Sequence, residues 1–444
     1  MEMLNRNTRK KVIDDGEERL HVVYSPKASS READLVIGYD GGSTQGRCII
    51  IDIEAENPMA EMETTYVAPS VSSFVPDDRT ITPKSGELFD NMDSYIANTS
   101  GKMDALVQTL RVIRGQKMVD ESLAENRLSS SDLKTTDPVF YANIVDGIGY
   151  ALIQKYGDAV PHKVNIFLGV ALPPDDKGEI SQNRLRENLN KFSWTHRPSN
   201  TKLEMSINVV SVMTEPEAFV KAHYARLGEE IPDHCLHIEG GGRSTGVEIL
   251  RNGVSLDAAQ RSLSYGGSQL LDNIAQMYVN KYGGARPTRR VMEIAIRKGY
   301  IQSGNSQVDI VEMIKQAKED YAKQIVNDVV QQVFDQQQQV RLLDVNIITV
   351  SGRLMAAGDY GISMAPFVEA EFKKRSPHTD FSHLSENLIP FGLTIEAYME
   401  YMDRVEANSA NNELQGDTTA LEQVAASAET NAPVANANDV NKPQ

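Results

Sequence analysis

Two glycine-rich turns combine the residue types that can hold a phosphate group. They are Asp40-Gly-Gly-Ser-Thr44 and Glu239-Gly-Gly-Gly-Arg-Ser-Thr245. Glycine tolerates the positive φ angles that gather backbone N–H groups into a concave cluster, and Ser and Thr hydroxyls add further donors. The acid that opens each turn could hold Mg²⁺ directly or through water. The first turn alone is better explained as a tight hairpin, but its repetition favours two loops that clamp a polyphosphate.

A third chemical candidate lies between the turns, in Thr214-Glu-Pro-Glu-Ala218. Pro216 disfavours helical angles at Glu215 and suits the first position of a helix, so Glu215 is expected at a strand-to-helix corner. A carboxylate at a strand end of an α/β sheet can orient or deprotonate a water aimed at a γ-phosphate. The alternative is an ordinary first-turn acid that the helix dipole stabilises. Neither turn matches GxxxxGK[ST] or GxGxxG, which disfavours P-loop and Rossmann sites.

The elements that would position these residues alternate along the chain. Each glycine turn joins two apolar strands, so the two hairpins indicate an internal duplication. Segments in which a strand runs into a turn of small residues are predicted at 35–44, 235–246 and 346–355, and further strands at 47–53, 164–170, 208–212 and 247–250. Helical spacing is predicted at 86–115, 139–156, 178–192, 216–226, 266–282, 287–301 and 306–341. The alternation predicts an α/β fold with a mixed or mostly parallel sheet.

The amino-acid composition argues against several classes of function. The 444 residues include 45 Lys and Arg against 62 Asp and Glu, and the net charge of −17 opposes direct nucleic-acid binding by the whole surface. Cys48 and Cys235 lack metal-ligand spacing and are expected to be small buried hydrophobic residues. No apolar run is long enough for a membrane helix, and the N-terminus lacks a hydrophobic signal region. We therefore expect a cytoplasmic protein with no membrane partner.

The two ends of the chain differ in composition from the middle. Residues 1–34 mix acidic and basic side chains and are expected to be a mobile extension with one short strand at His21–Tyr24. Residues 405–444 are rich in Ala, Asn, Thr and Gln, and their few charges are mostly acidic, so we expect a disordered acidic tail.

The order of the motifs resembles the actin/Hsp70/sugar-kinase superfamily. The resemblance covers about 35–404 and rests on five motifs. Asp40-Gly-Gly-Ser-Thr44 resembles the first phosphate loop, Thr214-Glu-Pro-Glu-Ala218 the connecting segment and Ile238-Glu-Gly-Gly-Gly-Arg-Ser-Thr245 the second phosphate loop. Ser264-Tyr-Gly-Gly-Ser-Gln-Leu-Leu-Asp-Asn273 resembles the helix start that follows, and Thr349-Val-Ser-Gly-Arg-Leu-Met355 the adenosine motif. It implies a two-lobed actin-like ATPase fold, with each lobe a mixed five-stranded sheet flanked by helices and the nucleotide in the interlobe cleft. Lobe I would span 35–232, completed by a helix at 385–404, and lobe II would span 233–384.

Carried over by position, the resemblance assigns a role to each motif. Asp40 and Glu239 would position Mg²⁺, through water, and Glu215 would orient the attacking water; these three are the catalytic candidates. Nucleotide contacts would come from Gly41, Gly42, Ser43, Thr44, Gly240, Gly241, Gly242, Arg243, Ser244, Gly352, Arg353 and Met355. Glu239 replaces the usual Asp, and Met355 stands where Hsp70-like proteins place an adenine-stacking Arg. The implied cofactors are ATP, with GTP also compatible, and Mg²⁺.

Within the superfamily, the Asp-x-Gly-Ser-Thr start is most similar to the bacterial plasmid-segregation actins of the ParM and Alp groups. The substrate-binding domain of an Hsp70 chaperone is not expected in the residues after 404. The resemblance implies a bacterial, phage-encoded or plasmid-encoded ATPase that forms homopolymer filaments and contacts DNA only through a DNA-binding adaptor protein. The alternative is a non-polymerising small-molecule kinase or nucleotide sensor of the same superfamily.

Overall fold

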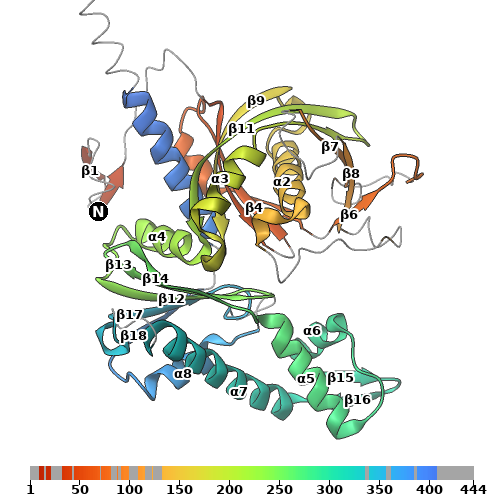
Figure 1. Ribbon diagram of the computed structural model, residues 1–444, viewed down its shortest axis with the longest axis vertical. Coiled ribbons are helices and arrows are strands. Elements are labelled where there is room, and N and C mark those ends of the chain that lie inside the picture. The colour runs from red at the N-terminus through yellow and green to blue at the C-terminus, as the bar shows by residue number, and fades with distance from the viewer. Residues whose placement is uncertain are drawn as a thin grey trace, which may run out of the picture. The chain divides into compact units, whose positions relative to one another are not determined.

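The computed structural model describes residues 10–14, 17–21, 33–42, 45–70, 72–81, 88, 92–99, 109–115, 123, 133–335, 340–356, 362–384 and 388–407 (Figure 1). The chain divides into two compact units, Met1–Tyr398 and Met399–Gln444. Both large sheets belong to the first unit and are mixed, with helices packed against them. The predicted α/β fold class is therefore confirmed.

The first sheet has nine strands in the order β5-β4-β3-β9-β11-β10-β7-β8-β6. Strands β3, β9 and β11 are parallel, and the other neighbours are antiparallel. Five strands were expected, and they correspond to β5-β4-β3-β9-β11; four more strands continue the sheet from β11 and leave that long strand without an open edge. The bounds are β3 (Leu35–Gly41), β4 (Gln45–Asp52), β5 (Thr65–Pro69), β6 (Ser72–Val75), β7 (Asp93–Asn98), β8 (Leu110–Arg114), β9 (Lys163–Leu172), β10 (Lys191–His196) and β11 (Thr201–Thr214).

The helix predicted at 86–115 is wrong, because its described residues include strands β7 and β8. Arg111 and Arg114 of β8 are buried, and each is paired with an acid from another element. Arg111 Nη2 lies 2.8 Å from Asp93 Oδ2, and Arg114 forms an ion pair with Asp146. In the sequence these charges suggest the polar face of a helix, whereas here they are core positions neutralised by distant partners.

The second sheet has the expected five strands, in the order β14-β13-β12-β17-β18. Strands β12, β17 and β18 are parallel, while β12, β13 and β14 are antiparallel. A separate hairpin joins β15 to β16. The bounds are β12 (His234–Gly240), β13 (Thr245–Arg251), β14 (Val254–Leu263), β15 (Tyr300–Ser303), β16 (Ser306–Asp309), β17 (Ile347–Ser351), β18 (Asp380–His383), α5 (Gly267–Tyr282), α6 (Arg289–Lys298), α7 (Val311–Val329) and α8 (Ala365–Lys373).

The predicted helix at 306–341 is shorter than expected. Its first residues form β16, α7 follows, and Val330–Asp335 forms a π-helical turn. Buried residues of α7, among them Ile314, Tyr321 and Ile325, belong to the core of the second sheet. The apolar spacing therefore identified a core face but not the turn that precedes the helix.

The first sheet packs against α2 (Pro138–Tyr156), α3 (Glu179–Asn188) and α4 (Glu215–Leu227), and against residues 389–398 of a last helix that spans 389–407. This last helix lies directly on the sheet. A Cβ atom on Gly38 of β3 would come within 2.3 Å of Thr394 Oγ1, and one on Gly169 of β9 within 2.5 Å of the Leu393 carbonyl oxygen. The helix was predicted at 385–404 with a tail from 405, but it continues to residue 407. Residues 408–444 lie outside the described residues.

Three other expectations can be compared with the described residues. The N-terminal segment contains a hairpin of β1 (Lys10–Asp14) and β2 (Glu17–His21). Of the strand predicted at His21–Tyr24, His21 ends β2 and residues 22–24 lie outside the described residues. Cys48 and Cys235 are free thiols and fully buried, as predicted. Among the residues the structure describes, none of the helices has the length and apolar character that a membrane crossing requires.

Candidate nucleotide site

Two of the predicted catalytic carboxylates lie at the carboxyl edge of the first sheet. Asp40 is the penultimate residue of β3, and Glu215 directly follows β11 as the first residue of α4. The Thr214 side chain caps α4 by accepting a hydrogen bond from the Glu217 N–H at 3.0 Å. Glu215 therefore lies at a strand-to-helix corner, as predicted. Because β3 and β11 flank β9 in one parallel block, their carboxyl ends meet at the same edge.

The second predicted phosphate loop follows β12 and is held by the start of α5. The Gly241 N–H donates to the Ser244 carbonyl at 3.0 Å, which closes the turn. The Gly241 carbonyl accepts from the Gly267 N–H at 3.0 Å, and the Gly242 carbonyl accepts from Ser268 through both its N–H and its hydroxyl. These bonds fix the backbone of the loop before any ligand binds. Arg243 and Ser244 are half-buried within it.

The predicted adenosine motif is in direct contact with this second loop. Gly352 has a φ of 89°, and a Cβ there would lie 2.5 Å from Glu239 Oε1, so only glycine fits. The Leu354 N–H donates to the Gly240 carbonyl at 2.8 Å. Arg353 is exposed, whereas Met355 is 1% exposed and belongs to the core of the second sheet. A contact between Met355 and a base stays a prediction.

The first predicted phosphate loop is described only in part. Gly41 ends β3 and pairs with Gly46 of β4, and Gly42 is half-buried. Ser43 and Thr44 lie outside the described residues, so their roles stay predictions. Arg47 Nη1 lies 3.8 Å from Asp40 Oδ2 and brings a positive charge to the base of this turn.

Asp40, Glu215 and Glu239 form what we call the carboxylate cluster. Asp40 is 4% exposed and Glu239 is 9% exposed, so neither is well solvated. Burial, together with repulsion from Glu215 and Asp40, raises the pKa of Glu239 well above its usual range. Three loops that are far apart in the sequence therefore bring together negative charge that is only partly compensated.

Lys134 is the cation in this cluster that sequence reasoning missed. It belongs to the 3₁₀ turn η3 (Lys134–Thr136), and its Nζ lies 2.8 Å from Glu215 Oε1. Its N–H donates to Asp176 Oδ2 at 2.9 Å, and Asp176 lies in the turn η5 (Pro174–Asp176) after β9. Burial alone would lower the pKa of Lys134, but Glu215, Asp40 and Asp176 raise it. No motif surrounds Lys134, so only the fold reveals its position.

The carboxylate cluster fits a magnesium ion that a nucleotide brings with it. In the part of the chain that the structure describes, no three His, Cys, Asp or Glu side chains are grouped as a complete metal site. Mg²⁺ usually keeps several waters and takes one or two carboxylates together with phosphate oxygens. Asp40 and Glu239, from the two loops, offer such a pair of oxygen donors, and a divalent cation would relieve their repulsion.

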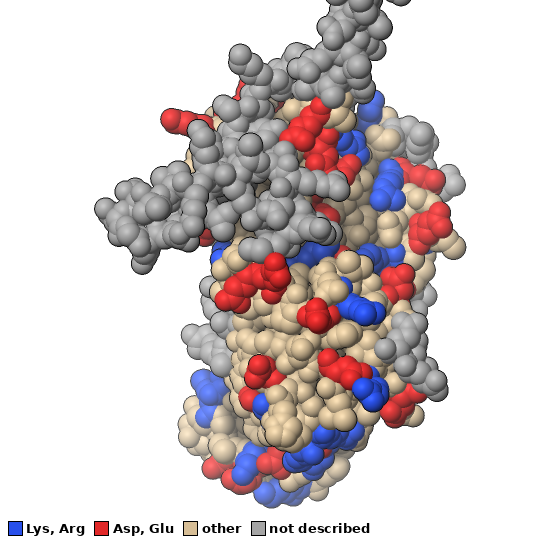
Figure 2. Space-filling view, turned by 90° about the vertical axis from the view of Figure 1, so that its left-hand side faces the viewer, with Lys and Arg blue, Asp and Glu red and all other residues tan. Residues whose placement is uncertain are grey.

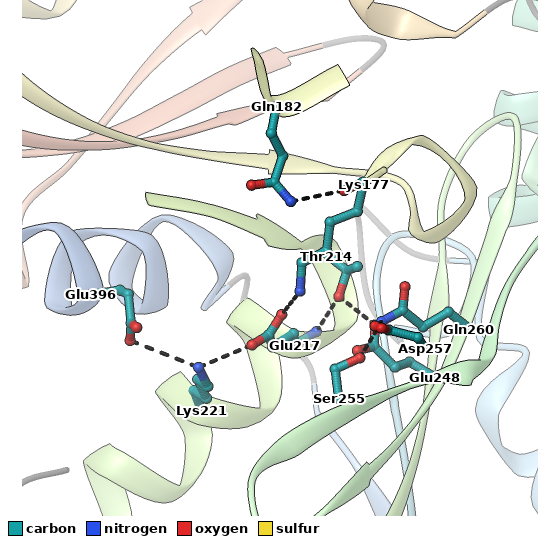
Figure 3. Close-up of polar contacts among 10 residues, drawn as sticks. All are labelled: Lys177, Gln182, Thr214, Glu217, Lys221, Glu248, Ser255, Asp257, Gln260 and Glu396. Atoms are coloured by element: carbon teal, nitrogen blue, oxygen red, sulfur yellow. Dashed lines mark hydrogen bonds and ion pairs between the residues drawn. The ribbon is translucent and has the colours of Figure 1, made fainter. Parts of the chain in front are cut away.

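A second set of charged side chains lies on the same helix as Glu215. The Glu217 carboxylate accepts from Lys177 Nζ at 2.5 Å and from Lys221 Nζ at 3.0 Å, and Lys221 Nζ lies 3.8 Å from Glu396 Oε2 (Figure 3). We call these four residues the α4 network. Although burial opposes ionisation, the two lysines lower the pKa of Glu217. The network ties α4 to the segment after β9 and to the last helix.

Glu248 of β13 approaches the same corner from the second sheet. It accepts a hydrogen bond from the Thr214 hydroxyl, as Figure 3 shows. Glu248 is fully buried, and burial raises its pKa to about 7. Thr214 thus links the start of α4 to the sheet that carries the second loop. The sequence gives no signal for this contact, because Glu248 looks like an ordinary polar position in a strand.

The comparisons with known proteins agree with this geometry. Residues 241–345 match the family model described as the C-terminal part of archaeal actin homologue MreB-like proteins. No curated protein sequence matches the chain at a significant level. The family match thus begins in the second loop and extends over α5, α6 and α7.

Solved structures match over most of the chain. The archaeal actin homolog Ta0583 is 14% identical with a TM-score of 0.58, and 84% of this chain covers 99% of that one. The actin-like protein Alp7A is 13% identical with a TM-score of 0.58, at 86% and 99% coverage. A non-polymerisable quadruple mutant of pCBH ParM is 12% identical with a TM-score of 0.51, at 83% and 99% coverage. A further structure of Ta0583 contains ADP.

At these identities the likeness establishes the fold. The chain has an actin-like fold, and its predicted resemblance to the actin-like superfamily, with ParM and Alp proteins among its structural neighbours, is confirmed.

Proposed function

We propose that this protein is an actin-like ATPase that assembles into nucleotide-dependent filaments. The observation that carries the proposal is the convergence of Asp40, Glu215 and Glu239 from three separate loops, with Lys134 beside them. A cluster that places repelling carboxylates out of solvent is costly unless a ligand uses it. ADP bound to the neighbour Ta0583 and the polymerisation implied for pCBH ParM support the nucleotide and the filament.

In this proposal the two loops bind the phosphates from opposite lobes. Lobe I would comprise 35–232 and the helix at 389–407, and lobe II would comprise 233–384, with the interlobe cleft between them. Backbone N–H groups and hydroxyls of the two loops would bind phosphate oxygens. Gly352 and Arg353 would contact the adenosine. The residues concerned are Gly41, Gly42, Ser43, Thr44, Gly240, Gly241, Gly242, Arg243 and Ser244.

The chemistry divides among the carboxylates. Asp40 and Glu239 would hold Mg²⁺ through water, and the metal would neutralise charge on the phosphates. Glu215 would orient a water toward the γ-phosphate and accept its proton as the bond to ADP breaks. Lys134 balances the charge of Glu215 and would stand close to the transferred phosphoryl group. ATP is the proposed nucleotide, and GTP is the competing one.

The cellular role we propose is DNA or plasmid segregation in a bacterial cytoplasm. The net charge of −17 opposes direct contact between the filament and DNA. A DNA-binding adaptor protein would therefore link the filament to its cargo.

A matched pair of variants tests the catalytic part of this proposal. Glu215→Gln removes the proposed base but keeps the shape of the side chain, and should slow phosphate release by at least about a hundredfold while polymer still forms. Glu312→Gln changes an exposed first-turn acid of α7 and should leave the rate unchanged. Equal rates for Glu215→Gln and the wild type would exclude the assigned role of Glu215.

A further inference from the structure

The exposed large hydrophobic side chains are not spread evenly over the described residues. Val291 and Ile294 of α6 are 39% and 38% exposed, although Met292 and Ala295 on the same helix are buried. Close to α6, Tyr282 at the end of α5 and Val311 at the start of α7 are also exposed. A Cβ on Gly299, which ends α6, would lie 2.9 Å from Val311 Cγ2. One end of the second sheet's helices thus carries apolar surface in contact with solvent.

The same region is strongly basic. Residues 281–298 contain six Lys or Arg and one acid, Glu293, in a chain whose net charge is −17. Arg290, Arg297 and Lys298 are exposed and lie three or four residues from Ile294, so they share its helix face. We call Arg290, Val291, Ile294, Arg297 and Lys298 the α6 patch. Figure 1 draws α6 on its right-hand side, so the α6 patch does not lie on the face that Figure 2 shows, where Lys and Arg at the lower end are mixed with Asp and Glu.

A second surface has the opposite charge and its own exposed hydrophobic residues. Leu227, the last residue of α4, is 53% exposed, and residues 227–233 contain three acids and no Lys or Arg. The β13–β14 turn lies beside this segment, because the Asn252 N–H donates to the Asp233 carbonyl at 3.0 Å. Val254, the first residue of β14, is 58% exposed. We call Leu227, Glu229, Glu230, Asp233 and Val254 the acidic patch.

We propose that the α6 patch of one molecule docks on the acidic patch of the next. Each patch offers exposed hydrophobic side chains beside an excess of charge of one sign. The excess is positive on α6 despite Glu293, and negative on the acidic patch despite Arg226 and Arg251 at its edge, so the two are complementary. Like patches repel each other, which disfavours a symmetric pair. A contact between two different surfaces of the same chain is heterologous, and it continues indefinitely when its rotation does not close a ring. The inference rests on the proposed filament and identifies its longitudinal contact.

Charge reversal on each side tests the contact in the full chain. Arg290→Glu with Arg297→Glu, or Glu229→Arg with Glu230→Arg, should raise the critical concentration for polymerisation in Mg-ATP at least about tenfold, equivalent to 1.4 kcal/mol. In a mixture of the two double variants, one contact is wild-type and the other is charge-swapped but complementary, so the mixture should form a polymer in which the two variants alternate, although neither variant polymerises well alone. Combining all four substitutions in one chain should restore a critical concentration near that of the wild type.

Matched controls separate the contact from the fold. Lys163→Glu with Lys202→Glu reverses two exposed lysines of the first sheet and should leave polymerisation unchanged. Binding of mant-ATP by every variant reports an intact nucleotide site. The milder Ile294→Ser and Val254→Ser variants should each raise the critical concentration without any change of charge.

Two results would overturn the inference. A double reversal that polymerises like the wild type excludes its patch from the contact. So does a combined variant that binds mant-ATP and stays monomeric. Failure of the proposed function looks different, because the wild type itself would then bind mant-ATP and form no polymer in Mg-ATP.

Discussion

Glu215 and Glu217 stand two residues apart in the first turn of α4 and enter opposite electrostatic environments. Glu217 is held between Lys177 and Lys221, and Glu396 completes a balanced set of two acids and two bases. Glu215 has one close cation, Lys134, and among the described residues the three acids of the carboxylate cluster face two cations, Lys134 and Arg47. The first arrangement satisfies its own charges, whereas the second holds an excess of negative charge.

The balance of charge distinguishes a structural cluster from a ligand-binding site. A buried ion pair whose charges balance can fix neighbouring elements without any ligand, and removal of one partner is costly. A buried cluster with unbalanced charge destabilises the fold in the absence of a ligand, so its persistence indicates a function that needs it. The α4 network is therefore interpreted as the anchor of α4, and the carboxylate cluster as the place where a metal-nucleotide complex binds.

The largest difference in the free energy of unfolding is expected between variants of Glu217 and Glu239. Glu217→Ala leaves Lys177 and Lys221 without their shared carboxylate, and should lower the free energy of unfolding by about 3 to 5 kcal/mol. Glu239→Gln removes a repelled charge, and should change that free energy by less than about 1 kcal/mol while Mg-ATP binding is lost. Urea unfolding of both variants without nucleotide gives the comparison. Equal losses of stability would remove the distinction between the two sets.

The next effect is the pH dependence of the free energy of unfolding that the titration of Glu248 causes. Burial raises its pKa from 4.5 to about 7, so the folded chain binds this proton more tightly than the unfolded chain does. Its contribution to stability is therefore present below pH 4.5 and is lost as pH rises to 7, a change of about 3 kcal/mol.

Glu248→Gln removes this titration while keeping an acceptor for the Thr214 hydroxyl. The free energy of unfolding should then decrease less between pH 5 and pH 8 than it does in the wild type, as measured by urea unfolding at both values. Parallel pH profiles for the two proteins would show that Glu248 does not titrate in this range.

The smallest effect is expected from substitution of Lys134 in the carboxylate cluster, and it concerns the rate of phosphate release. Lys134→Ala removes the charge that balances Glu215, and should slow phosphate release on the order of tenfold. Lys134→Arg keeps the charge and should recover part of the rate. If the alanine variant releases phosphate as fast as the wild type, Lys134 contributes to packing and not to the reaction.

The parts of the fold that could be predicted from the sequence were those with local signals. The two glycine turns, the Pro216 corner at Glu215 and the apolar strands β3, β9, β12 and β17 each combine a pattern and a turn residue within a few positions. They led to the correct fold class and placed three catalytic candidates at strand ends. Helices α2, α4 and α5 were predicted within one residue of their observed ends.

The parts that failed depend on partners far away in the chain. Strands β7 and β8 were taken for a helix because the acids that neutralise Arg111 and Arg114 lie 18 and 32 residues away. Lys134 was missed because Glu215, its partner, is 81 residues further on. No local pattern records such a pairing, so only the folded chain reveals which charges are balanced and which are not.

In the proposed filament-forming ATPase, the carboxylate cluster couples nucleotide hydrolysis to polymer dynamics. Right-angle light scattering, followed together with phosphate release after addition of Mg-ATP, tests it most directly, with Mg-GTP and a non-hydrolysable ATP analogue in parallel. We expect scattering that rises with Mg-ATP and decays as phosphate appears, and that persists with the analogue. Phosphate release with flat scattering would contradict the filament and favour a soluble kinase, and nucleotide binding without either signal would favour a sensor.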